Sequence, residues 1–99
     1  MKYLIAGLLC LLASSAGAET WVKKYPPLPA NKPVYLRGDL FRVNCFDMYG
    51  QALACAIRYP YPNATRCKIY INADKIRRGT PMAAYAEAHE RKHCAGYVH

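Results

Sequence analysis

This sequence of 99 residues lacks an apolar run long enough to cross a membrane as a helix. Its first apolar run, residues 4–12, is about half of the roughly 18 residues that such a helix needs. The run follows Lys2 and precedes Ala16-Gly17-Ala18, and this order is typical of an export signal. We therefore predict that residues 1–18 are a signal peptide, cleaved after Ala18, and that the mature chain has no transmembrane segment.

Export would place the mature protein in the periplasm or outside the cell, where disulfide bonds form and persist. Cys10 leaves open an alternative in which the chain is processed as a lipoprotein. Leu9 stands before this cysteine where a small residue is expected, and this favours the soluble product.

Acidic residues are scarce: six Asp and Glu stand against 14 Lys and Arg, and the formal net charge is +8. In an exported protein this imbalance suggests attraction to an anionic envelope surface or an acidic protein, and a role in solubility alone is the alternative. Nucleic acid is not expected, because export separates the chain from most of it. The densest basic cluster, Lys75-Ile76-Arg77-Arg78-Gly79, is expected to be a solvated turn.

Internal repeats and low-complexity tracts are absent from the sequence, so we predict one small domain, residues 37–99, behind an arm. The arm, residues 19–36, contains four prolines and is expected to run extended over the surface, held down by Trp21 and Tyr25. Apolar and polar residues alternate in three later segments, residues 40–45, 52–59 and 67–71. We predict that these segments form an antiparallel meander whose cysteines face the core.

The segment from Thr80 to Gly96 carries helix start and stop signals. Thr80 suits the N-cap, Pro81 suits the first helical position, and Gly96 suits the C-terminal cap. At about 100° per residue, five apolar or histidine residues fall on one stripe of this helix: Met82, Tyr85, Ala86, His89 and His93. We expect an α+β fold, in which a small antiparallel sheet of about three strands packs on this one C-terminal helix.

No C-x-x-C pair occurs, and this disfavours a cysteine-ligated zinc site. Four cysteines remain after the predicted cleavage: Cys45, Cys55, Cys67 and Cys94. An even number in a small exported chain predicts two disulfides, and a domain of this size needs such staples. Three pairings are open. Cys94 lies on the flank of the predicted helix, which favours pairing it with Cys67, and Cys45 with Cys55.

Histidine is also scarce, and all three histidines lie in the final segment HERKHCAGYVH. Four residues apart on a helix, His89 and His93 point the same way and can offer two nitrogens to one tetrahedral zinc ion. Glu90 lies beside them, where it can take a proton from water without occupying a ligand position. Gly96 can end the helix in a left-handed turn and bring His99 round as the third ligand. Three imidazoles leave one coordination position open, as in catalytic zinc sites.

The combination His89-Glu90-x-x-His93-x-x-Gly96-x-x-His99 resembles the zinc signature of the metzincin metallopeptidases. A chance match in a chain this short is on the order of one in a hundred thousand. The resemblance implies that the three histidines bind one Zn²⁺, that Glu90 is the general base and acid, and that Gly96 is the turn residue. It also implies a sheet whose edge strand binds the substrate backbone, for which residues 67–71 are the closest candidate. A Met-turn follows the third histidine in that family, so the resemblance is to a minimal form that lacks it.

These features together predict an exported minimal zinc metallopeptidase that hydrolyses a peptide or protein substrate. The alternative is a non-catalytic, zinc-stabilised and disulfide-linked basic binding protein of the cell envelope. A disulfide-stapled basic module without metal is a third interpretation. A ligand on a terminal residue such as His99 is expected to be mobile.

Overall fold

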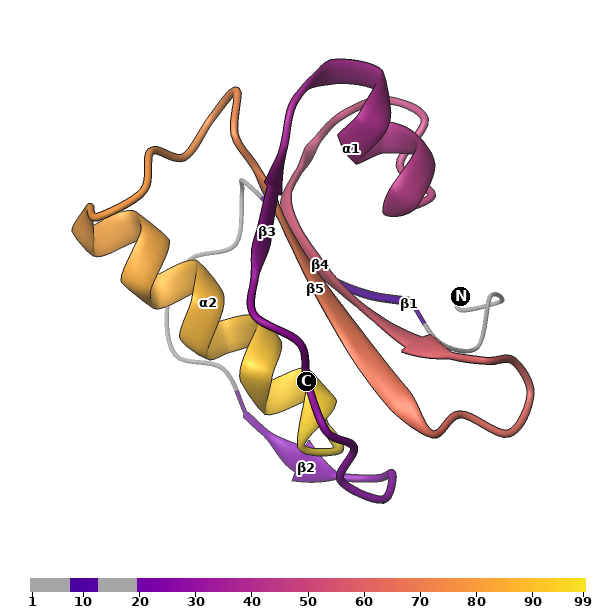
Figure 1. Ribbon diagram of the computed structural model, residues 1–99. Coiled ribbons are helices and arrows are strands. Elements are labelled where there is room, and N and C mark those ends of the chain that lie inside the picture. Colours follow the sequence, from indigo (N-terminus) through magenta and orange to yellow (C-terminus); the bar gives the residue numbers. More distant parts are fainter. Residues whose placement is uncertain (1–7, 13–19) are drawn as a thin grey trace.

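The structure, a computed structural model, describes residues 8–12 and 20–99. It is an α+β fold, as predicted, with α2 packed on one face of the larger sheet (Figure 1). The strands are β1 (Leu8–Leu12), β2 (Val22–Lys23), β3 (Val34–Leu36), β4 (Ala52–Tyr59), β5 (Arg66–Asn72) and β6 (Tyr97–Val98). The helices are α1 (Gly38–Asn44) and α2 (Pro81–Cys94). Neither helix in the described part of the chain has the length and apolar character needed to span a bilayer.

The larger sheet has the strand order β1-β4-β5-β3, and β2 and β6 form a separate pair. β4 and β5 occupy two of the predicted segments and pair antiparallel, with Cys55 opposite Tyr70. The predicted antiparallel meander is wrong in one respect, because β3 comes from the arm and pairs with β5 in parallel. β3 has only three residues and directly follows Pro33. So short a segment shows too little alternation to be identified as a strand from the sequence.

The strand predicted at residues 40–45 is also wrong, since this segment lies in α1 and its C-terminal cap. Phe41 and Cys45 are fully buried, whereas Val43 between them is 71% exposed. Burial at every fourth residue is the helical period, so the apparent alternation came from one exposed valine. Asp39 in the first turn and Arg42 in the last turn complement the helix dipole.

Each face of the sheet carries one helix, and a disulfide joins each helix to the sheet. Cys67–Cys94 links β5 to α2, and Cys45–Cys55 links the end of α1 to β4. The favoured pairing is therefore confirmed. Because both faces are covered, β4 is buried at consecutive positions, Ala54, Cys55 and Ala56, rather than only at the alternate positions that we predicted.

α2 begins where its signals predict. The Thr80 hydroxyl accepts a hydrogen bond from the backbone N–H of Ala83 at 3.2 Å, and Pro81 is the first helical residue. Two residues predicted on the buried stripe are instead half exposed, Met82 at 49% and Tyr85 at 50%. The buried face is rotated toward Glu90 and Cys94, the flank that the Cys67–Cys94 disulfide holds against the sheet.

The predicted signal peptide lies mostly outside the described residues. Within it, the structure describes only residues 8–12, which form β1 and pair antiparallel with β4. Cleavage after Ala18 and the lipoprotein alternative at Cys10 therefore stay predictions. The two disulfides are compatible with an exported protein.

Candidate metal centre

The three histidines come together at the C-terminal end of α2. Their ring centroids are 4.9 Å apart for His89 and His93, and 5.0 Å for each of these with His99. One ligand nitrogen from each ring lies within 4.8 Å of the others. Three imidazoles that share one tetrahedral ion hold their centroids about 5 Å apart, since each nitrogen lies about 2 Å from the ion. The cluster could therefore hold a metal ion, and imidazole donors suit Zn, Cu, Fe or Ni.

Hydrogen bonds at Nδ1 orient the two helical histidines. The Nδ1 atom of His93 lies 3.0 Å from the backbone oxygen of Tyr97. Because a carbonyl can only accept, Nδ1–H of His93 donates, and the lone pair for a metal is then on Nε2. The Nδ1 atom of His89 lies 3.2 Å from Oε2 of Glu90. This carboxylate oxygen likewise accepts a hydrogen bond from Nδ1–H. Both rings thus present Nε2 to the cluster.

Glu90 lies beside the cluster, as the sequence predicts. Its side chain is fully buried, and its Oε2 atom is the partner of His89. A carboxylate held next to an imidazole ligand can orient that ligand and can also exchange a proton with water at the centre.

His99 reaches the cluster through a turn and a short strand pair. Gly96, at φ +105°, turns the chain directly after α2, and its N–H donates to the His93 carbonyl at 2.9 Å. β6 then pairs antiparallel with β2, with Val98 opposite Val22, so the tail is held by backbone hydrogen bonds. Figure 1 shows the C-terminus and β2 at the same end of α2. The expected mobile terminal ligand is thus tied to the arm in this structure.

Gly96 also allows the arm to approach closely. Its carbonyl accepts hydrogen bonds from the N–H groups of Lys24 at 2.8 Å and Tyr25 at 3.0 Å. A Cβ atom at position 96 would collide with the Tyr25 carbonyl oxygen and lie 2.9 Å from its carbon. The glycine is therefore required twice, by its backbone angle and by this contact.

Trp21 is a site residue that the sequence did not assign to the centre. Its ring centroid lies 5.1 Å from His89, 5.1 Å from His93 and 4.8 Å from His99, edge-on to each. It is therefore nearly equidistant from the three imidazoles and restrains them together. Lys92 lies over this indole at 5.5 Å. Only the β2–β6 pairing brings residue 21 beside residue 99, so no local pattern could have revealed it.

Arg58 supports the centre from the sheet. It is 7% exposed, and its guanidinium donates to the backbone carbonyls of His93, Cys94 and Pro26. Burial lowers the pKa of this arginine, and the Tyr25 ring lies 5.1 Å from it. A cation at the carbonyl end of α2 also complements the helix dipole. Arg58 thus joins the sheet, the helix end and the arm, and its position in β4 gave no sequence signal for this role.

Other predicted neighbours of the centre lie elsewhere. Residues 67–71 are in β5, which lies between β4 and β3, so this segment is not the edge strand that the resemblance suggested. Tyr85 is half exposed rather than in the core, and its ring lies 5.8 Å from His89. Neither methionine was predicted to support the metal: Met48 and Met82 both precede the motif, and they are 82% and 49% exposed.

Comparisons with protein-family models, with curated proteins and with solved structures find no match to this chain.

Proposed function

We propose that the protein is an exported zinc metallopeptidase, similar to a minimal metzincin, that hydrolyses peptide bonds. One observation carries the proposal: His89, His93 and His99 converge within ligand distance while Glu90 is buried beside them. Three imidazoles favour zinc in a site with one open position. Bound there, zinc would polarise the scissile carbonyl and lower the pKa of the attacking water.

Glu90 would move the proton in both halves of the reaction. Its carboxylate takes a proton from the attacking water as the water oxygen bonds to the carbonyl carbon. The same proton then passes to the amine nitrogen as the C–N bond breaks, so Glu90 returns to its starting state. The hydrogen bond between His89 Nδ1 and Oε2 holds the carboxylate beside that ring.

The substrate would bind as an extended strand along β4. The proposal is supported by β1, which pairs antiparallel with β4 along this edge of the sheet. If export removes residues 1–18, the β4 edge is open to a peptide that adds by backbone hydrogen bonds. Backbone pairing selects an extended chain rather than a sequence, so we expect loose specificity.

The test measures metal content and peptide hydrolysis on the oxidised protein. We expect one zinc per chain and turnover of an unfolded protein substrate. Glu90→Gln should keep the zinc and lose at least about 100-fold in turnover, the range for removal of a general base. Glu87→Gln, on the same helix, is the matched control and should keep both. His99→Ala should lose zinc.

Each alternative has its own result. Stoichiometric zinc without hydrolysis in the unaltered protein would favour a zinc-stabilised binding protein of the envelope. No zinc at any concentration tested would leave a disulfide-stapled basic module. Equal hydrolysis in the unaltered protein and in Glu90→Gln would show that the activity does not come from this centre.

A further inference from the structure

A pocket of about 830 Å³ lies beside the loop that leads into the N-terminal end of α2, away from the histidines. It is formed where β3 leads into α1 and where β5 leads toward α2. The helix rises about 1.5 Å per residue, so His89 and His93 lie about 12–18 Å along the helix from this end. The pocket is therefore separate from the metal centre.

The pocket has an apolar floor and a cationic rim. Its floor includes Leu36 and Ile76. Its rim carries four basic side chains, Arg37, Lys75, Arg77 and Arg78, and one acidic side chain, Asp74. Three of these cations belong to the cluster at residues 75–79, which the sequence alone predicts to be a solvated turn. The fold gathers them around one concavity with Arg37 from a distant segment.

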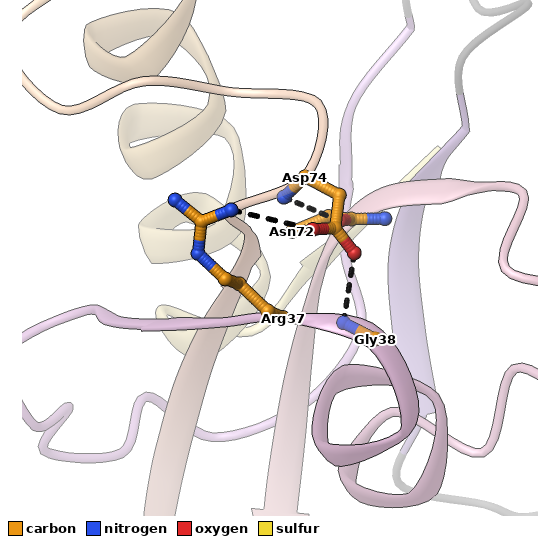
Figure 2. Close-up of polar contacts among 4 residues, drawn as sticks. All are labelled: Arg37, Gly38, Asn72 and Asp74. Carbon is orange, nitrogen blue, oxygen red and sulfur yellow. Dashed lines mark hydrogen bonds and ion pairs between the residues drawn. The ribbon is translucent and has the colours of Figure 1, made fainter.

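The one carboxylate of the rim is already engaged. The backbone N–H of Gly38 donates to Oδ2 of Asp74 at 2.8 Å, and the Arg37 guanidinium lies 3.7 Å from Oδ1 (Figure 2). Within residues 20–99, no carboxylate lies at ion-pair distance from Lys75, Arg77 or Arg78. Like charges around one pocket repel each other, and a bound anion would remove that repulsion.

One arginine of the rim is held in place. The guanidinium of Arg78 lies 4.1 Å from the centroid of the Tyr35 ring. The Tyr35 hydroxyl in turn donates to Oε2 of Glu87 on α2 at 2.6 Å, which fixes the ring. A planar guanidinium held in this way presents paired N–H donors, the geometry that matches a phosphate group.

We propose that this pocket binds the phosphate group of an anionic ligand. Lys75, Arg77 and Arg78 supply the charge, and Leu36 and Leu40 contact the apolar or sugar part to which the phosphate is attached. The proposal is independent of the peptidase, because the pocket lining includes neither the histidines nor Glu90. The phosphate can come from a soluble ester or from the headgroup of an anionic lipid.

The experiment compares two triple variants with the same loss of charge. In the pocket variant, Lys75→Gln, Arg77→Gln and Arg78→Gln are combined. The control variant combines exposed cations outside the pocket: Lys32→Gln, Arg42→Gln and Arg66→Gln. The probes are inorganic pyrophosphate, titrated by calorimetry, and vesicles of phosphatidylglycerol or phosphatidylcholine, tested by cosedimentation. Chelation of zinc by pyrophosphate affects both variants equally, so their difference reports the pocket.

We expect saturable pyrophosphate binding that falls at least 10-fold in the pocket variant and less than threefold in the control, with peptide hydrolysis unchanged in both. If pyrophosphate also displaces the protein from phosphatidylglycerol vesicles, the source is a lipid headgroup. Binding of pyrophosphate without vesicle binding makes it a soluble ester. An equal loss in both variants, or no saturable binding to either probe, would overturn the proposal.

Discussion

Replacing Gly96 with alanine tests how the third histidine is positioned. The residue has φ +105°, and an added Cβ would collide with the carbonyl oxygen of Tyr25. The arm must then move away from the end of α2. That movement breaks the two hydrogen bonds that the Gly96 carbonyl accepts from Lys24 and Tyr25.

The expected loss in the free energy of unfolding has two parts: the backbone strain at position 96 and the loss of the two hydrogen bonds. A non-glycine residue in such a backbone conformation costs about 1–3 kcal/mol. Each lost hydrogen bond adds about 0.5–1.5 kcal/mol, so the total is about 2–6 kcal/mol. Gly79 supplies the matched control: it has φ +79°, but nothing lies within 4 Å of its added Cβ. Gly79→Ala should therefore cost only the backbone term.

Urea unfolding followed by circular dichroism, with a chelator present, measures both variants without any contribution from metal. Zinc titration of the folded proteins then shows whether displacing the arm weakens binding through His99. If Gly96→Ala is no less stable than Gly79→Ala and binds zinc as tightly as the unaltered protein, the close approach of the arm does not position the ligand.

Three further predictions concern other parts of the structure. Arg58→Met should lower the free energy of unfolding by about 2–4 kcal/mol, because buried backbone carbonyls lose a charged donor; Arg58→Lys should not restore it, and full stability in Arg58→Met by urea unfolding would contradict this. Trp21→Ala should weaken zinc binding about 10-fold in a competition titration, since outer contacts of ligand histidines have effects of this size; unchanged affinity would remove the indole from the centre. Burial and the hydrogen bond to Glu87 raise the pKa of Tyr35 from 10.0 to about 12. The folded state then holds this proton more tightly than the unfolded state, so stability should fall as pH rises from about 10 to about 12. A pH series of urea unfolding should show that Tyr35→Phe lacks this decrease.

The sequence predicted best where the signal is local. The helix start at Thr80 and Pro81 and the strand at residues 52–59 follow from capping chemistry and alternation over a few neighbours. The disulfide pairing was favoured for a local reason too, since Cys94 lies on the flank of a helix. The prediction failed at residues 40–45, because apolar residues at alternate positions also include the i, i+4 pair that a helix buries. Which of these residues are buried depends on how α1 packs on the sheet, and this packing leaves Val43 exposed.

The same division applies to the candidate centre. The sequence alone determined that His89 and His93 share one helical face, with Glu90 beside them and a glycine after the helix, because the α-helical period is intrinsic to the backbone. The tertiary structure decided how His99 is held, which aromatic ring contacts all three imidazoles, and which arginine anchors the helix end. Those contacts bring residues 21 and 99 together through the β2–β6 pair, and they link residue 58 to buried backbone carbonyls at the end of α2. Such pairings depend on the packing of distant segments and leave no periodic trace in the sequence.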